Sequence, residues 1–425
     1  MRILLDQAVH DHRNQGNNVL LDTALKRFKA FWPDAEFGII SHAPHLCRYY
    51  FPNAIPVSPE TLLPLAGSAD IPHKLLPLFA WRLLFEIRDF HMVQVLLKIF
   101  LTSRKKDDRW SVKDEVPENL NGAGGKYPGM TNYDFYVLTG GGYMCDSDKR
   151  FMLKVFDRLE KAVELGIPAV MVSQGVGPLG DSDLIKRGRE VLPKIDYIMI
   201  REERATLPIL DMLNVPRAKV VMTGDDAIEP AYLAHSEIMG NGIGLSLRIA
   251  QYTNVNAGNI ASLKPLILQK AKQYNAELVA VPIDINDSDK SYVEEIISDY
   301  GKSYSPWGKF DNHAELIHRT SRCRVMVSGT FHAAVFAVSQ GIPVIALANS
   351  TEYQIKATGL TAEFGEDGCR VINLSDPKFV ERFFEAFDLA WSSAENLRPR
   401  LLQEAKRQIN MGYHAYQKIF LRIGS

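Results

Sequence analysis

The chain has 425 residues with 50 acidic and 49 basic side chains, so its formal net charge is −1. This balance gives no overall electrostatic attraction to nucleic acid or to an anionic membrane, and no basic stretch with interleaved aromatic residues indicates nucleic-acid binding. The length is too great for one ordinary hydrophobic core and predicts two domains.

Four cysteines are scattered along the chain without a CxxC pair. This pattern indicates a reducing compartment and gives no support for a disulfide framework or a zinc site. Asp284, Asp287 and Asp289 are interpreted as a solvated turn rather than a metal site. We therefore expect a protein without metal or cofactor. Because the sequence has neither a signal-peptide h-region nor an apolar run of ~20 residues, we also expect a cytoplasmic location.

Strands and helices alternate along the first half of the chain. Such regular alternation predicts a parallel doubly wound sheet. The expected strands lie at 2–5, 36–40, 54–57, 133–139, 168–173, 197–200 and 219–222, and the clearest helices at about 19–32 and 149–165.

Residues 58–131 interrupt this alternation. We expect a helical insertion there, with an aromatic-rich amphipathic helix at 75–101 that packs on the sheet or on another subunit of a homo-oligomer. A second interpretation is that 75–101 contacts a lipid-linked acceptor or the membrane interface, which would make the protein peripheral at the inner face of the membrane. Charged residues such as Arg82 and Glu86 exclude a membrane span.

A second series of strands and helices begins near residue 243. The pattern lapses at 229–242, so we expect Rossmann-like domains at 1–235 and 236–395 that face a cleft, and a C-terminal helix at 396–425 that packs back on the first domain. The expected strands are 243–247, 277–281, 324–327, 344–347 and 370–372, and the expected helices are 263–274, 291–300, 313–320, 331–340, 377–393 and 397–419.

The segment 328–347 is the most informative part of the sequence. Ser328 ends a predicted buried strand, so His332 lies in the first turn of the next helix. Ligands of open α/β sheets bind at the carboxyl ends of strands, and helix N-termini attract anions. His332 is therefore a candidate for proton transfer or for a hydrogen bond to phosphate, with a satisfied core histidine as the alternative. Ser328 and Thr330 add hydroxyl groups beside it.

Small and polar residues follow several strands of the first half. Glycines there allow a ligand to approach the backbone or the chain to turn sharply, and amide side chains can donate and accept hydrogen bonds; an asparagine can alternatively cap a helix, as we consider for Asn18. The candidate binding residues of this group are Asn17, Asn18, Gly141, Gly142, Gln174 and Gly175.

Arg201 and Arg248 each follow a strand of apolar residues, one in each half of the chain. A guanidinium matches phosphate and carboxylate groups in a bidentate manner, so each arginine is a candidate anion clamp. A structural ion pair is the alternative, for Arg201 with Glu202, Glu203 or Asp225.

Glu352 and Lys356 follow the strand after His332. They place a carboxylate and an ammonium group beside the same predicted pocket. A solvated ion pair is the alternative for these two residues.

In combination, these motifs resemble the polysaccharide pyruvyl transferase family. The matching motifs span about residues 1–360 and are 14–18, 137–143 with Asp146, 173–179, 200–203, 223–225, and Phe331-His332 leading to 341–343 and Lys356. The resemblance implies a GT-B-like fold and transfer of a pyruvyl group from phosphoenolpyruvate to a sugar hydroxyl of a glycan or lipid-linked saccharide, as a ketal, in exopolysaccharide biosynthesis of the cell envelope. It also implies that His332 is the general acid or base and that Arg201 binds the donor.

The sequence departs from the family pattern at Thr330, because the family usually has an arginine two residues before the histidine. Arg248 is our candidate for the missing charge. The first loop also departs from the family's Asn-x-Gly-Asp form, with Gly16-Asn-Asn18 in its place.

Two other functions are compatible with parts of the sequence. The segments 328–330, 341–343 and 350–352 resemble the nucleotide-sugar site of GT-B glycosyltransferases and UDP-sugar 2-epimerases, in which a glycine-rich helix start would hold the diphosphate and a carboxylate the ribose. A non-catalytic subunit of a polysaccharide assembly system is the third interpretation. The presence of His332, Arg201 and Gln174 argues against it.

Overall fold

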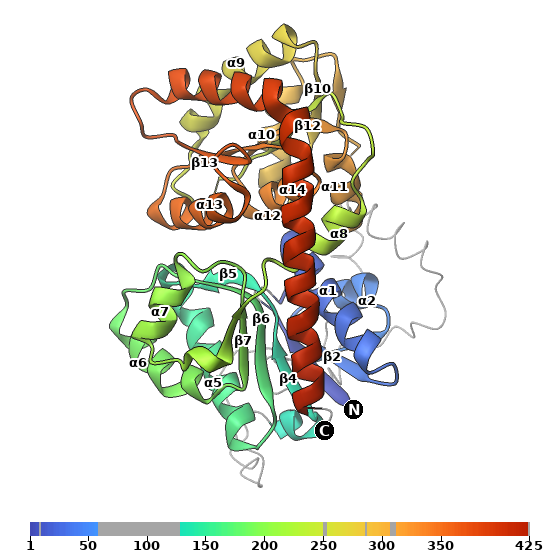
Figure 1. Cartoon of the computed structure of the whole chain (residues 1–425), viewed down its shortest axis with the longest axis vertical. Coiled ribbons are helices and arrows are strands. Elements are labelled where there is room, and N and C mark those ends of the chain that lie inside the picture. Colours follow the sequence, from blue (N-terminus) through green and yellow to red (C-terminus); the bar gives the residue numbers. More distant parts are fainter. Residues whose placement is uncertain (8–9, 58–127, 250–252, 285–286, 307–311, 424–425) are drawn as a thin grey trace, which may run out of the picture.

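The computed structural model describes residues 1–7, 10–57, 128–249, 253–284, 287–306 and 312–423. The two domains lie one above the other, and one long helix runs along both (Figure 1). The helix expected at 75–101 and most of the insertion expected at 58–131 lie outside the described residues.

The first domain contains one parallel sheet of eight strands, in the order β3-β2-β1-β4-β6-β7-β8, with β5 paired to β6. This arrangement confirms the doubly wound sheet that the alternating pattern predicts. The strands are β1 (Arg2–Asp6), β2 (Glu36–Ile40), β3 (Ala54–Val57), β4 (Phe135–Leu138), β5 (Gly141–Met144), β6 (Ala169–Val176), β7 (Tyr197–Ile200) and β8 (Val220–Met222).

Helices cover both faces of this first sheet (Figure 1). They are α1 (Gln15–Phe31), α2 (Pro44–Tyr50), α5 (Lys149–Glu164), α6 (Ser182–Val191) and α7 (Thr206–Met212), and α8 (Ile228–Leu233) follows the last strand. Short 3₁₀ turns lie at Pro128–Asn132, Asp146–Asp148, Leu192–Lys194 and Arg217–Lys219.

The second domain contains a parallel sheet of six strands in the order β11-β10-β9-β12-β13-β14. Its strands are β9 (Gly242–Ser246), β10 (Glu277–Ala280), β11 (Ser303–Tyr304), β12 (Cys323–Ser328), β13 (Val344–Ala348) and β14 (Cys369–Asn373). Its helices are α9 (Ala257–Gln273), α10 (Asp287–Ile297), α11 (His313–Thr320), α12 (Phe331–Ser339) and α13 (Thr351–Phe364).

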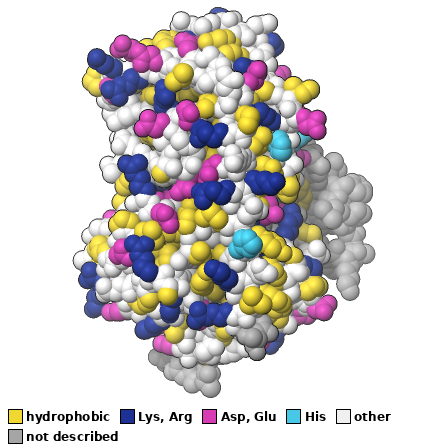
Figure 2. Space-filling view, viewed as in Figure 1, with side chains coloured by type: hydrophobic (Ala, Val, Ile, Leu, Met, Phe, Trp, Pro, Cys, Tyr) yellow, Lys and Arg dark blue, Asp and Glu magenta, His cyan; other side chains and the backbone are white. Residues whose placement is uncertain are grey.

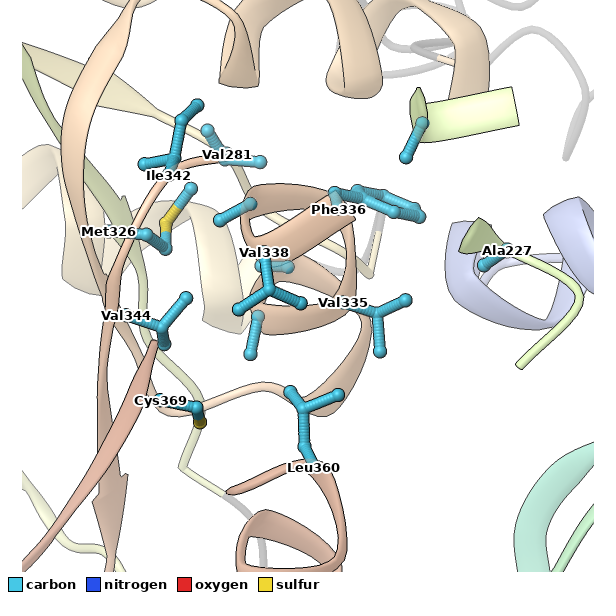
Figure 3. Close-up of a cluster of buried hydrophobic side chains, with 14 of the residues drawn as sticks. Ala227, Val281, Met326, Val335, Phe336, Val338, Ile342, Val344, Leu360 and Cys369 are labelled. Carbon is cyan, nitrogen blue, oxygen red and sulfur yellow. The ribbon is translucent and has the colours of Figure 1, made fainter. Parts of the chain in front are cut away.

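Helix α12 is the centre of a hydrophobic core that extends across both domains. Every residue from His332 to Ser339 is buried, as expected for a helix that is apolar on all sides. Val335, Phe336 and Val338 of α12 lie among side chains of the second sheet, of α13 and of the segment before α8 (Figure 3). Val19 and Leu20 of α1 belong to the same cluster, so the first domain packs directly on the helix that begins beside His332.

The C-terminal region forms one continuous helix of 45 residues, α14 (Phe379–Ile423). Our expectation of two helices, at 377–393 and 397–419, is wrong because Pro399 lies inside α14. A proline in a helix interior removes one hydrogen bond and usually kinks the helix, and Figure 1 shows α14 bending between its first part, across the second domain, and its long part, which runs along both domains. Phe387 packs in the second domain, Leu401 in the shared cluster and Tyr416 in the first domain.

A buried ion pair joins α1, the connection between the domains, and α14. Arg27 of α1 donates to Asp226 Oδ1 at 2.6 Å and lies 2.7 Å from Glu229 Oε2. Tyr416 of α14 donates to the other oxygen of Asp226 at 2.6 Å, and the guanidinium lies 4.9 Å from the Tyr416 ring centroid. Gly412 leaves room for this arginine, because a Cβ there would lie 3.0 Å from its Nη1.

Among the described helices, none combines the length and the apolar composition that a bilayer span requires.

We predict that Arg27→Met destabilises the protein much more than the neighbouring control Lys26→Met. Removing Arg27 leaves the buried Asp226 carboxylate without its cation, which costs about 3–5 kcal/mol. Lys26 pairs with Asp22 at the surface, with 70% of its side chain exposed, and loss of such a pair costs about 0–1 kcal/mol. Urea unfolding of the two variants measures the difference, and equal midpoints would contradict a role for this cluster in joining the domains.

Candidate functional site

A cavity of about 280 Å³ lies between the two domains at the carboxyl ends of their strands. Acidic and basic side chains also lie along the waist between the two lobes of the molecule (Figure 2). The first domain contributes Asp11, Asn14, Asn17, Gly142, Tyr143, Asp148 and Arg201 to the cavity lining. The second domain contributes Arg248, Ile283, Asp284, Thr330, Phe331, His332, Glu352, Tyr353 and Lys356.

The loop from β12 to α12 places His332 at the edge of the cavity. Ser328 donates a side-chain hydrogen bond to the Thr330 carbonyl (2.7 Å) and accepts one from the Thr330 N–H (3.1 Å). The hydroxyl groups of Thr330 and Ser246 are 2.7 Å apart. Ser328 therefore stabilises the turn and does not line the cavity, whereas Thr330 and His332 do.

His332 is a buried histidine in a mostly cationic environment. Burial is the largest of the effects that lower its pKa to about 4; nearby Arg201, Arg248 and Lys356 also lower the pKa, while Asp225 opposes them. Within the described part of the chain, Nε2 of the ring has no hydrogen-bond partner and lies 4.0 Å from Asp225 Oδ2. At neutral pH the ring is therefore uncharged, and it can accept a proton.

The N-terminus of α1 packs against the His332 ring from the first domain. A Cβ at Gly16 would lie 2.1 Å from Nδ1 of His332, which is far inside van der Waals contact. The Gln15 N–H also donates to the Ile283 carbonyl of the second domain at 2.8 Å. Glycine at position 16 thus permits the close approach of the two domains at the site.

Arg201 follows β7 and enters the cavity from the first domain. Its guanidinium lies 4.0 Å from the Phe331 ring centroid, and Nη1 donates to Asp225 Oδ2 at 3.3 Å. A Cβ at Gly175 would lie 2.6 Å from Nε of this arginine. Gly175 therefore provides space for Arg201, and the ion pair with Asp225 does not remove Arg201 from the cavity lining.

Arg248 follows β9 and enters the cavity from the second domain. Its Nε and Nη2 donate to Asp289 Oδ2 at 2.9 and 2.7 Å, and Nη2 lies 3.3 Å from Asp284 Oδ2. Asp289 is 1% exposed, so the interpretation of these aspartates as a solvated turn is wrong for this residue. The carboxylates hold the guanidinium in place at the cavity.

Glu352 and Lys356 are one turn apart on α13 and form an ion pair of 2.5 Å within the cavity wall. Their side chains are only 11% and 12% exposed, so they are not a solvated surface pair. A Cβ at Gly142 would lie 2.9 Å from Cε of Lys356, and this glycine therefore lets the lysine reach the first domain.

Three other predicted binding residues lie outside the cavity lining and have structural contacts. The Gln174 side chain donates to the carbonyls of Leu138 (3.1 Å) and Thr139 (2.8 Å) and is fully buried. Asn18 donates to the His12 carbonyl at 2.8 Å. Gly141 begins β5, with φ 158°.

The helix cap that we considered for Asn18 belongs to Asn14, which accepts a hydrogen bond from the Asn17 N–H at 3.1 Å. Helix α1 therefore begins at Gln15 and not at about residue 19. An asparagine followed by helix-compatible residues is itself a capping signal, and it was available in the sequence.

The sequence motifs did not identify the aspartates of the cavity lining. These are Asp11, Asp148 and Asp284. Burial raises the pKa of Asp148, an effect that Glu352 reinforces and Lys356 opposes. Asp11 and Asp148 belong to no motif and Asp284 was interpreted as part of a solvated turn, so only the folded chain brings these carboxylates into one cavity.

The two parallel sheets with a cavity between them define the two-domain GT-B-like class of fold. Comparison with known families matches residues 14–351 to the family described as polysaccharide pyruvyl transferase. The match covers most of the sequence, so the chain belongs to the polysaccharide pyruvyl transferase family. No curated protein sequence matches the chain closely.

Solved structures share the fold at low sequence identity. MnaA of S. aureus, in a co-structure with UDP, is 12% identical over 98% of this chain and 94% of its own, with a TM-score of 0.55. UDP-GlcNAc 2-epimerase from Neisseria meningitidis, bound to UDP-GlcNAc, is 13% identical over 96% and 99% of the two chains, with a TM-score of 0.51. A UDP-glucosyltransferase from Polygonum tinctorium is 11% identical over 100% and 98%, with a TM-score of 0.52.

We predict that Gly16→Ala destabilises the protein, whereas the matched change Gly258→Ala does not. Both glycines are the second residue of a helix that follows an asparagine cap, and helix propensity alone favours alanine by up to ~1 kcal/mol. At Gly16 the new methyl group would overlap His332, and such overpacking costs about 1–3 kcal/mol. At exposed Gly258 the nearest atom is Asn256 Oδ1 at 3.1 Å, which need give by only a few tenths of an ångström. The melting temperatures of the two variants measure the difference. A Gly16→Ala variant that is more stable than the wild type would contradict the close contact of Gly16 with His332.

Proposed function

We propose that the protein transfers a pyruvyl group from phosphoenolpyruvate to two hydroxyl groups of a saccharide, with His332 as the residue that moves the proton. The observation that carries the proposal is the uncharged His332 in one cavity with cations from both domains. The acceptor is a glycan or a lipid-linked saccharide, and the expected cytoplasmic location remains part of the same proposal.

The charges of the cavity suit a donor with two separate anionic groups. Arg201 approaches from the first domain, and Arg248 and Lys356 approach from the second. Phosphoenolpyruvate carries a phosphate and a carboxylate, both of which arginine binds through charge-assisted hydrogen bonds. The family usually has an arginine at the position of Thr330. Because Arg248 lines the cavity, it can supply this positive charge to the donor instead.

The proposed reaction balances without a cofactor. His332 accepts the proton of one acceptor hydroxyl, and that oxygen bonds to C2 of the enolpyruvyl group as the C2=C3 π bond breaks. The π electrons take up a proton at C3, which becomes a methyl group, and the proton held by His332 balances this addition. The bond from C2 to the phosphate oxygen breaks, the second acceptor oxygen bonds to C2, and its proton leaves with phosphate. The products are one pyruvate ketal and one phosphate.

A nucleotide-sugar donor is the second candidate function. The fold likeness to a UDP-GlcNAc 2-epimerase and a UDP-glucosyltransferase favours it, although identities of 11–13% support only the fold. The cavity, of about 280 Å³, is slightly smaller than typical ligand pockets, which occupy roughly 300–1,000 Å³. This volume supports a small donor such as phosphoenolpyruvate over a nucleotide-sugar.

We predict that phosphoenolpyruvate raises the melting temperature of the wild-type protein and that UDP does not. A ligand at 100 times its dissociation constant stabilises the folded state by about 2.7 kcal/mol. Arg201→Met should weaken donor binding roughly 10–100-fold, as expected when a hydrogen bond to a charged group is lost. The control Arg204→Met changes an exposed arginine outside the cavity lining and should bind normally. A thermal shift with UDP but none with phosphoenolpyruvate would transfer the assignment to the nucleotide-sugar function.

We also predict that His332→Ala lowers turnover by roughly 10²–10⁴-fold, the usual effect of removing a general acid or base. Phosphate release from phosphoenolpyruvate in the presence of saccharide acceptors measures turnover, and the methyl signal of the ketal identifies the product. Turnover near that of the wild type would exclude His332 from proton transfer. Weaker donor binding with turnover retained would instead make His332 a ligand of the phosphate.

A further inference from the structure

We propose that Asp225 is a positioning residue of the site: it holds Arg201 of the first domain and His332 of the second in one arrangement, with the imidazole proton on Nε2 and the lone pair on Nδ1. The inference deepens the proposed function and rests on it for the identity of the proton that Nδ1 accepts. The arrangement itself rests on geometry alone.

Burial, one hydrogen bond and the conformation of the preceding glycine fix the Asp225 carboxylate. The residue follows β8 and is 6% exposed. Its Oδ1 accepts the Ala227 N–H at 2.9 Å, which orients the carboxylate plane. The preceding Gly224 has φ 82°, a left-handed conformation that favours glycine, and a Cβ there would lie 2.3 Å from Gln408 Oε1 of α14. The long helix therefore determines where this loop places its carboxylate.

The second oxygen of Asp225 lies between the two functional side chains. Oδ2 accepts from Arg201 Nη1 at 3.3 Å and lies 4.0 Å from His332 Nε2. Buried polar atoms are normally paired, yet Nε2 has no hydrogen-bond partner among the described residues. A proton on Nε2 points a donor toward the carboxylate, whereas a lone pair there would face its negative charge. The first tautomer is therefore the favourable one.

This tautomer leaves Nδ1 as the basic nitrogen. Nδ1 lies against the main chain of Gly16, with no side chain between them, and Asn14 and Asn17 on either side of Gly16 line the cavity. Among the described residues, Nε2 but not Nδ1 of this ring is a fully buried atom without a hydrogen-bond partner. When Nδ1 takes the proton of an acceptor hydroxyl, the ring becomes an imidazolium. Asp225 is then the carboxylate that offsets the repulsion from Arg201, Arg248 and Lys356, the charged groups that oppose protonation.

The charge of Asp225 and its positioning of neighbouring side chains affect different measured quantities, namely donor affinity and turnover. Asp225 is a negative group close to an anion site, so removing its charge would by Coulomb's law strengthen the binding of an anionic donor. If the carboxylate also orients Arg201 and His332, its removal lowers turnover even though donor binding is kept or improved. The two effects are therefore separable by measurement.

The first test is the tautomer of His332, which does not depend on any activity. In protein labelled with ¹⁵N-histidine, the His332 signals are those that disappear in His332→Gln. At neutral pH we expect the Nε2–H form in the wild type and a larger share of the Nδ1–H form in Asp225→Asn. The control Asp211→Asn changes an exposed aspartate that pairs with Arg217 and should leave the signals unchanged. The same tautomer in wild type and Asp225→Asn would overturn the proposal.

The second test separates turnover from donor binding. With phosphoenolpyruvate and an acceptor, Asp225→Asn should lower kcat roughly 10–100-fold, since a small misplacement of reacting groups can cost ~10²-fold, while the dissociation constant for phosphoenolpyruvate stays equal or falls. An unchanged kcat would overturn the proposal. If Asp225→Asn does not fold, Asp225→Ser serves instead, because a serine hydroxyl can still accept the Ala227 N–H.

The two tests distinguish failure of this inference from failure of the proposed function. If the wild type does not bind phosphoenolpyruvate, the proposed donor is wrong, and the ¹⁵N tautomer measurement still decides whether Asp225 positions His332. If the donor binds and turns over but Asp225→Asn behaves as the wild type in both tests, the donor assignment stands and the positioning role is excluded.

Discussion

The buried contact of Arg27 with Asp226 is the constraint on which the geometry of the site depends. It joins the first helix to the start of the connection between the domains, and Tyr416 adds the long C-terminal helix to the same cluster. A buried ion pair is stable only if both charges keep their partners, so the three elements must keep their relative positions. Helix α1 is thereby held with its N-terminus against His332, and Asp225 directly precedes the anchored aspartate.

The charged side chains that the site needs come from both domains. Each domain supplies cationic side chains to the cavity, and neither supplies all of them. The arginines are held by buried carboxylates, Arg201 by Asp225 and Arg248 by Asp289, which limits side-chain motion and moderates the positive charge. Such preorganised charges lower the reorganisation that binding and reaction require. His332 remains neutral in these surroundings and keeps its capacity to accept a proton.

Much of the fold was predictable because its signals are local. Parallel strands that are buried on both faces appear as short apolar runs, and alternation with helices predicts two doubly wound sheets. Predictions from the sequence were wrong where a local rule about helix ends was outweighed by contacts elsewhere in the fold. Pro399 should interrupt a helix, but α14 packs on both domains along its length and continues through it. Asn18 had the character of a cap, while Asn14, four residues earlier, has the geometry of one.

The sequence by itself determined the class of fold and the family, because these follow from the order of strands, helices and motifs along the chain. It also determined the location of His332 at a helix start beside a strand end, because this follows from residue order within one βα unit. Only the tertiary structure decided which candidates share the cavity. Gln174 and Arg201 both follow strands predicted from the sequence, yet Gln174 lies inside β6 with its amide N–H groups donated to backbone carbonyls, whereas the Arg201 guanidinium enters the cavity. The approach of Gly16 to His332 and the placement of Asp225 between two domains depend on contacts between residues more than a hundred positions apart, and no local pattern records them.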